Sequence, residues 1–319
     1  MSIANSKIRI YACGGAGINI ASPFKNERFD VVYVDSSDSN LKKVGEGAKT
    51  FLIKGMDGAG KLRRSTYVGF KDKVEACLIE NPPSTHLNIV LSSISGGTGS
   101  VTAPQITADL IEKGFPTIVI AVATKGSVIE VKNGINTIHT YANISKKLNS
   151  VVSVLYCDAS RQRKDTDAHI IDFLNLIALI TDRSKTDGAD TADLHNWINF
   201  NKVTDIEPCL SLLSPILNNG EEYEGETAEQ GVVASTLLVT KDPEEGVKGV
   251  FPEYHAEILI TSETDLKESF RIDNIVGLLP HMISQLEDLL ARSQDALKTA
   301  TIAEVESKES DEDDGFFVL

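Results

Sequence analysis

Two glycine-rich segments have the residue types and spacing needed to bind phosphate. Segment 95–100 (SGGTGS) follows the apolar run 87–91, and segment 13–19 (CGGAGIN) follows a first apolar run at 8–12. Each is expected to join a strand to a helix. There, glycines let backbone N–H groups approach an anion, and the helix N-terminus adds positive charge. Two such loops in one half of the chain predict a polyphosphate held from two sides.

A third segment, 54–61 (KGMDGAGK), follows a short strand candidate. Its Gly-Ala-Gly run at 58–60 can fold backbone N–H groups around an anion. Asp57 can hold Mg²⁺ through water, because Mg²⁺ prefers oxygen ligands and keeps part of its water shell. A surface turn is the alternative. The segment nearly matches the P-loop pattern, but Leu62 stands where that pattern needs a hydroxyl, so no P-loop is predicted.

The first glycine loop also supports a different function. The run Gly-Ala-Gly at 15–17, with Asp35 at the end of the second predicted strand, mimics a dinucleotide-binding fingerprint with its ribose carboxylate. An NAD-type oxidoreductase is therefore an alternative. The second glycine loop disfavours it, since hydride transfer needs no second phosphate cradle. A purely structural turn at 13–19 is a further alternative.

Asp190 and Asp193 place two carboxylates at positions i and i+3, just before or within a predicted helix start. The structural alternative is helix capping and dipole stabilisation, worth about 0.3–1 kcal/mol for each residue. Capping explains one aspartate well and two less well. A carboxylate in such a place can orient an attacking water and accept its proton during phosphoryl transfer.

Composition limits the class of protein. The chain has 319 residues, 41% apolar and 24% charged, which fits a globular protein of one or two domains. Its formal net charge of −15 disfavours direct nucleic-acid binding, because a phosphate backbone repels such a surface. Four widely spaced cysteines are expected to be free thiols in a reducing cytoplasm. The sequence predicts neither a secretion signal nor a membrane span.

Alternating strand and helix patterns predict an α/β, Rossmann-like domain with a parallel sheet covered on both faces. Strands are expected at 7–12, 30–35, 50–53, 87–92, 116–123 and 151–157. Ligands on such sheets lie beyond the carboxyl ends of the strands, where both glycine loops are expected. An apolar helical pattern from Asp165 to Thr181 predicts a helix buried between two layers.

The predicted organisation has five parts. They are a nucleotide-binding domain at 1–164, a central helix with the acidic loop at 165–199, a smaller α+β domain at 200–275, a long C-terminal helix at 276–302 and an acidic tail at 303–319. The tail carries seven acidic residues and one lysine, and is expected to be disordered in the free monomer.

The segment 95–100 resembles the GGGTGSG signature of the tubulin/FtsZ GTPases, with Ser95 and Val101 in place of its first and last glycines. The order of the segments and the acidic tail are most similar to the phage-encoded tubulins of the PhuZ type. The resemblance implies a cytoskeletal GTPase that hydrolyses GTP to GDP and phosphate on assembly, with Mg²⁺ as cofactor. The departures at Ser95 and Val101 leave open a filament protein that binds nucleotide without hydrolysing it.

The resemblance also implies site residues. Asp167 would read guanine, whose two N–H donors a carboxylate accepts, Glu130 would lie near the ribose, and Asp158 occupies the next candidate loop. Ordinary exposed acids are the alternative for all three. Asp190 and Asp193 would polarise the water that attacks the nucleotide of the next subunit. The other residues expected at the nucleotide are Gly14, Gly15, Ala16, Gly17, Asn19, Asp35, Ser36, Asp57, Gly58, Ala59, Gly60, Ser95, Gly96, Gly97, Thr98, Gly99 and Ser100.

The expected partner is a second copy of the chain in a head-to-tail filament, formed in the cytoplasm of an infected bacterium, where it would position viral DNA or virions. No membrane partner is expected. The tail is expected to fold onto another subunit, as in phage tubulins: its acids would meet a basic patch and its aromatic residues would fill a pocket. A solubilising tail is the alternative. The contact residues are Asp311, Glu312, Asp313, Asp314, Phe316 and Phe317.

Overall fold

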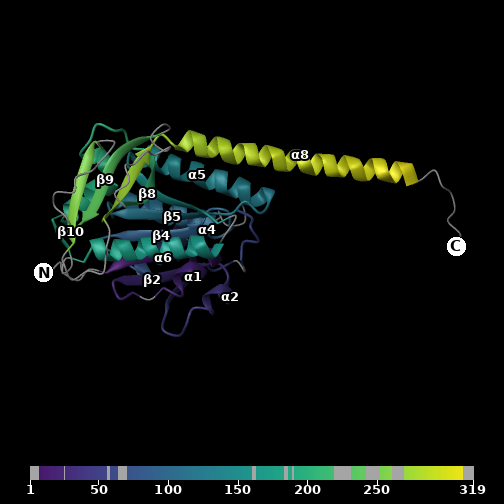
Figure 1. Cartoon of the computed structure of the whole chain (residues 1–319). Helices are drawn as coiled ribbons and strands as arrows, with labels where there is room; N and C mark the ends of the chain where they lie inside the picture. The colour runs from purple at the N-terminus through teal and green to yellow at the C-terminus, as the bar shows by residue number, and fades with distance from the viewer. Residues whose placement is uncertain are drawn as a thin grey trace.

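A computed structural model of the chain describes residues 7–24, 26–55, 58–63, 70–159, 163–182, 186–188, 190–218, 231–241, 252–260 and 269–311. Within these ranges, eleven strands form one sheet in the order β3-β2-β1-β4-β5-β6-β8-β11-β9-β10-β7 (Figure 1). The predicted α/β fold class is confirmed.

The first six strands run parallel to one another, at the places the sequence predicted. Along β1, Ile8 and Ile10 pack on one face of the sheet, whereas Tyr11 and Cys13 pack on the other, and all four are buried. Apolar side chains on both faces are typical of a parallel sheet covered by helices on each side. The strands are β1 (Ile8–Cys13), β2 (Phe29–Asp35), β3 (Lys49–Leu52), β4 (Asn88–Ser93), β5 (Thr117–Ala123) and β6 (Val152–Asp158).

Helices cover both faces of these strands. On one face lie α1 (Gly14–Ala21) and α6 (Arg163–Ile180), and on the other α3 (Phe70–Glu80) and α4 (Gly99–Glu112). The short helix α2 (Asp38–Leu41) follows β2, and α5 (Val128–Leu148) packs beside α4. The α6 residues Ile170, Phe173, Leu174 and Ile177 are almost fully buried, so the predicted central helix is present.

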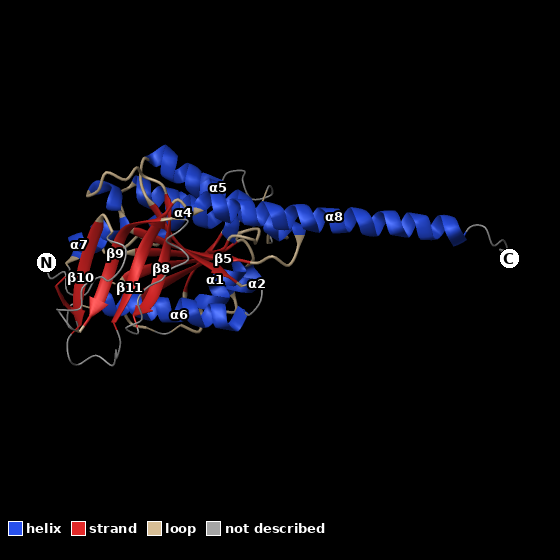
Figure 2. Ribbon diagram, turned by 45° about the horizontal axis from the view of Figure 1, so that its top comes forward, coloured by secondary structure: helices blue, strands red, loops and turns tan. Residues whose placement is uncertain are grey.

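The strands after α6 extend the same sheet, because β6 pairs with β8 in parallel. Figure 2 shows β8, β9, β10 and β11 side by side, next to α7. Trp197 of α7 is fully buried, and its indole N–H donates to the Ile272 carbonyl at 3.1 Å. The elements are β7 (Thr186–Gly188), α7 (Thr191–Ile198), the 3₁₀ turn η3 (Phe200–Lys202), β8 (Leu210–Asn218), β9 (Val232–Thr240), β10 (Tyr254–Ile260) and β11 (Ser269–Val276). A domain boundary near residue 200 stays a prediction.

The last helix, α8 (Leu279–Asp311), has 33 residues and runs far beyond the rest of the fold (Figure 1). Its apolar stripe, which includes Ile283, Leu286 and Leu290, packs against the α5 side of the core. The helix continues through 303–311, a segment expected to be disordered. The sequence there has no glycine or proline and contains Ala, Glu and Lys, which favour helix. Among the described helices, none is long and apolar enough to cross a membrane.

Candidate nucleotide-binding site

A cavity of about 460 Å³ lies at the carboxyl ends of the parallel strands, the edge where the sequence placed the ligand. Its walls include Cys13 at the end of β1, Asp35 at the end of β2 and Ser93 at the end of β4. The volume falls within the range of small-molecule sites. The predicted residues that line it are Gly14, Gly15, Ala16, Asn19, Asp35, Gly58, Ala59, Gly60, Gly96, Gly97, Thr98, Gly99, Glu130 and Asp167.

Four predicted residues stand behind this wall and shape it. Gly17 allows α1 to approach β4, since a Cβ there would lie 2.6 Å from the Leu91 carbonyl oxygen. The other three are serines whose hydroxyls tie the loops together: Ser36 Oγ lies 2.7 Å from Thr98 Oγ1, Ser95 Oγ donates to the Thr124 carbonyl at 2.9 Å, and Ser100 Oγ donates to the Gly97 carbonyl at 3.1 Å.

The other predicted acids differ in their surroundings. Asp158 is not part of the cavity wall but pairs with Lys125 at 2.6 Å. Asp35 is 2% exposed, and its carboxylate accepts the Ser36 and Ser37 backbone N–H groups and the Asn40 side-chain amide. This carboxylate therefore organises the loop after β2. Asp57 lies outside the described residues.

The three phosphate-binding candidates touch one another through glycines. A Cβ on Gly14, whose φ is +72°, would lie 2.9 Å from the Gly99 backbone nitrogen. A Cβ on Gly97 would lie 2.5 Å from the Ala59 Cβ and 3.1 Å from the Lys61 nitrogen. Loop 95–100 therefore contacts loop 13–19 on one side and loop 58–61 on the other, and a side chain at either glycine would force them apart.

We expect Gly97→Ala to lower nucleotide affinity at least about tenfold, because the added methyl displaces loop 58–61, which does not yield like the end of a flexible side chain. Titration with a fluorescent guanine nucleotide measures this. Gly45→Ala, a glycine change in the loop before β3 with open space around it and no left-handed φ, is the control and should retain wild-type affinity. Wild-type affinity in Gly97→Ala would contradict the packing argument.

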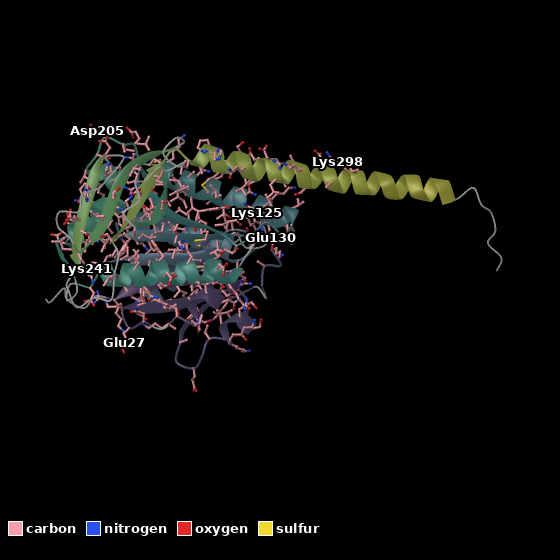
Figure 3. The ribbon with its side chains drawn as sticks, in the orientation of Figure 1. Glu27, Lys125, Glu130, Asp205, Lys241 and Lys298 are labelled. Carbon is pink, nitrogen blue, oxygen red and sulfur yellow. The ribbon has the colours of Figure 1, made fainter. Side chains whose placement is uncertain are left out.

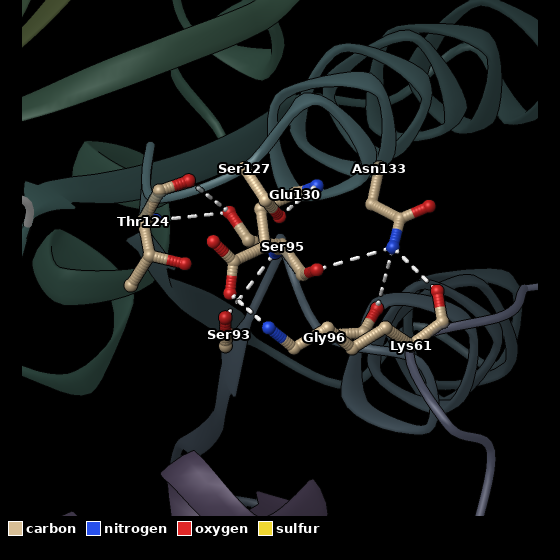
Figure 4. A network of polar contacts seen from close by, with 8 residues as sticks. All are labelled: Lys61, Ser93, Ser95, Gly96, Thr124, Ser127, Glu130 and Asn133. Atoms are coloured by element: carbon tan, nitrogen blue, oxygen red, sulfur yellow. Dashed lines mark hydrogen bonds and ion pairs between the residues drawn. The ribbon is translucent and has the colours of Figure 1, made fainter. Parts of the chain in front are cut away.

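A polar network at the start of α5 joins two of these loops (Figure 4). Asn133 is 5% exposed, and its amide donates to the Lys61 carbonyl at 2.9 Å and the Ser95 carbonyl at 3.1 Å. Lys61 Nζ lies 2.8 Å from Glu130 Oε1. The hydrogen bond from Lys61 lowers the pKa of Glu130, and the Ser127 hydroxyl and Gly126 backbone act in the same direction. Neither Lys61 nor Asn133 was predicted from the sequence as a site residue.

The start of α6 closes another side of the cavity. Asp167 and Arg163 both line it, with Arg163 Nε 3.8 Å from Asp167 Oδ2. Partial burial raises the pKa of Asp167, and the charge of Arg163 opposes that effect. A carboxylate beside a cavity, with one oxygen buried and without a hydrogen-bond partner, can accept N–H donors from a ligand. The sequence analysis did not identify Arg163.

The acid pair forms a reciprocal cap on α7. Asp190 accepts the Ala192 and Asp193 N–H groups at 2.7 and 3.1 Å, and Asp193 accepts the Asp190 N–H at 2.9 Å. The other oxygen of Asp193 accepts the Tyr254 hydroxyl at 3.0 Å. Asp190 is exposed to solvent. Helix capping, the predicted alternative to a role in hydrolysis, is therefore present and involves both carboxylates. Neither of them lines the cavity of its own subunit.

The acid pair lies near the amino ends of the parallel strands, whereas the cavity lies at their carboxyl ends. His195 of α7 contacts the carbonyl of His86, which precedes β4, whereas Ser93 at the far end of β4 lines the cavity. In Figure 3, Glu130, which lines the cavity, lies toward the end of the body over which α8 projects.

No protein-family model matches the chain. A phage tubulin-like protein of Pseudomonas phage PhiPA3 is 31% identical over 218 residues, which are 68% of each chain. The chain belongs to the phage tubulin-like proteins. A phage tubulin-like protein of Pseudomonas phage phiKZ is 25% identical over 214 residues.

Solved structures of this group share the fold of this phage tubulin-like protein. A protofilament of TubZ from bacteriophage PhiKZ superimposes with a TM-score of 0.83, covering 92% of both chains at 21% identity. The phage tubulin PhuZ with GDP gives a TM-score of 0.81, covering 92% of this chain and 93% of that one. The family predicted from segment 95–100 is therefore confirmed, and it disfavours the oxidoreductase alternative.

Proposed function

We propose that this phage tubulin-like protein binds and hydrolyses GTP and polymerises head to tail, with each active site completed by the neighbouring subunit. The observation that carries the proposal is the placement of a cavity lined by three glycine-rich loops at one edge of the sheet and an acid pair at the opposite edge. Family membership supports the same function.

Helix α6 connects the two edges. Its first turn, with Arg163 and Asp167, lines the cavity. Just beyond its end, the Thr181 carbonyl accepts a hydrogen bond from Arg28, which precedes β2 at the far edge. Its 18 residues span about 27 Å at about 1.5 Å per residue. Stacking one subunit on the next would bring exposed Asp190 toward the cavity of its neighbour, a contact between unlike surfaces that generates a filament.

The nucleotide and the assembly are supported by relatives of the same fold. PhuZ has been solved with GDP, and TubZ of PhiKZ as a protofilament. Mg²⁺ would be held chiefly by phosphate oxygens and water, with Asp57 as the candidate protein ligand. The described residues contain no cluster of three or more metal-ligating side chains. The relatives come from Pseudomonas phages, which supports a filament in the cytoplasm of an infected bacterium that positions viral DNA or virions.

Light scattering with parallel phosphate release, after addition of GTP, GDP or ATP, tests this function. We expect GTP to produce scattering and then phosphate, with release rising sharply above the concentration at which filaments form. GDP and ATP should produce neither. Phosphate release proportional to protein concentration, without scattering, would contradict a site completed by assembly.

A nucleotide-binding filament protein that does not hydrolyse GTP is the second candidate. The cap on α7 favours it, because both Asp193 oxygens already accept hydrogen bonds within the subunit. In that case GTP would induce scattering without phosphate release, and the filaments would not depolymerise.

Guanine selectivity is expected to depend on Asp167. Asp167→Leu should weaken GTP binding by at least about 1–3 kcal/mol, because two base N–H donors lose their acceptor, whereas Asp167→Asn keeps one acceptor oxygen and part of the affinity. Burial raises the pKa of Asp167, so acidification should lower GTP affinity before an ordinary aspartate would protonate. Competition between GTP and ATP measures both effects. Equal wild-type affinity for the two nucleotides would exclude this role.

A further inference from the structure

The wall of the nucleotide cavity has an excess of negative charge, although the proposed ligand is a polyanion. Among the described residues that line it, the charged ones are Asp35, Lys61, Glu130, Arg163 and Asp167. Arg163 lies beside Asp167, where the base is expected to bind. Lys61 directly follows the run 58–60, whose backbone N–H groups can surround an anion, so it is the cation next to the phosphate-binding candidates.

The backbone of Lys61 is held in an unusual conformation. Its φ is +62°, in the left-handed region that residues other than glycine seldom adopt. The Asn133 amide holds its carbonyl, and its nitrogen and Cα pack closely against Gly97. Non-glycine residues in this region gather at functional sites, where the surrounding structure enforces them. The backbone of Lys61, from which its side chain extends, is therefore fixed beside loop 95–100.

The side chain of Lys61 is far less constrained. Its ammonium pairs with Glu130 at 2.8 Å (Figure 4), but the Lys61 side chain is 55% exposed and the Glu130 side chain only 15%. Glu130 also interacts with Ser127 and Gly126, which hold it in place. An ion pair with one exposed partner contributes little and exchanges readily for a stronger one.

We propose that Lys61 is a triphosphate-sensing residue that leaves Glu130 and binds the terminal phosphate when the nucleotide carries one. This inference rests on the proposed function. A terminal phosphate carries more negative charge than one carboxylate and offers three acceptor oxygens, so it attracts the ammonium more strongly. GDP lacks this group, and Lys61 then remains with Glu130. Glu130 thus competes with the phosphate for a single cation.

The test measures the affinities of the full-length protein for GDP and for a non-hydrolysable GTP analogue, below the concentration at which it polymerises. Lys61→Met should weaken binding of the analogue about tenfold, the loss expected for one charge-assisted hydrogen bond, with little change for GDP. Glu130→Gln should have the opposite effect on the ratio of the affinity for the analogue to the affinity for GDP. It should strengthen binding of the analogue, because Lys61 is no longer neutralised.

Lys49→Met is the matched control. Lys49 pairs with Asp30 at 2.6 Å at the start of β3, away from the cavity, so its loss removes the same charge and an equivalent ion pair. Both affinities should remain unchanged. The inference would be overturned if Lys61→Met left the ratio of the two affinities unaltered. It would also be overturned if Glu130→Gln lowered the affinities for both nucleotides equally. Either result would leave the proposed function standing. Wild-type protein that binds neither nucleotide would overturn both.

Discussion

Deleting residues 304–319 is expected to leave a folded monomer that binds GTP but does not polymerise. Among the α8 residues whose side chains the structure describes, the apolar ones that pack against the α5 side of the core extend no further than Leu290, and the deletion begins well beyond this contact. Among the described residues that line the cavity, none belongs to α8. Folding and nucleotide affinity should therefore equal those of the wild type.

Assembly is expected to be lost because a long part of α8 projects beyond the rest of the fold. Residues 291–311 extend about 30 Å beyond the packed stripe at about 1.5 Å per residue (Figure 1). Most of the stability of a helix in a protein comes from packing one of its faces, so a long projecting helix gains stability when it packs on another molecule. A second subunit is the partner that the family supports. Glu312, Asp313, Asp314, Phe316 and Phe317 follow the helix and lie outside the described residues.

Sedimentation with GTP measures the effect of the deletion. Replacing Asp311, Glu312, Asp313 and Asp314 with alanine should raise the critical concentration, and added salt should have the same effect on the wild type, since both weaken charge attraction. The charge-matched control replaces four exposed acids on helices other than α8, Glu75, Glu80, Glu112 and Asp172. Pelleting of the truncated protein at the wild-type critical concentration would mean that the tail is a solubilising appendage.

The parallel sheet and its ligand edge were predictable because they follow from local patterns. Runs such as 87–91 are apolar on both faces, and a glycine loop after such a strand has its N–H groups at the carboxyl edge. The prediction of disorder was wrong for residues 303–311, which belong to α8. The helix-forming residues in this segment outweigh the charge density from which disorder was predicted.

Which loop residues face the ligand was not predictable from the motif. Ser95, Ser100 and Gly17 belong to the glycine segments, yet they lie behind the cavity wall and hold the loops together. Lys61 and Asn133 were missed because their importance arises from contacts between segments about seventy residues apart, for which a single sequence carries no signal.

Removing the acid pair is expected to block hydrolysis and spare nucleotide binding, since neither carboxylate lines the cavity of its own subunit. Asp190→Ala and Asp193→Ala also break the cap on α7, which costs about 1 kcal/mol. Asp190→Asn is the cleaner variant, because an amide oxygen still accepts the Ala192 and Asp193 N–H groups while the charge and the proton acceptor are lost.

Each of these variants should release phosphate about 10²–10⁴-fold more slowly than the wild type at filament-forming concentration, the usual contribution of a general base. GTP affinity should be unchanged, and the filaments should persist instead of disassembling. The tail-truncated monomer provides the independent control: it keeps both aspartates and the cavity but lacks a neighbour, so it should bind GTP and not hydrolyse it. Wild-type turnover in that monomer would place the hydrolytic group within the subunit, and wild-type turnover in Asp190→Asn would leave Asp190 with capping alone.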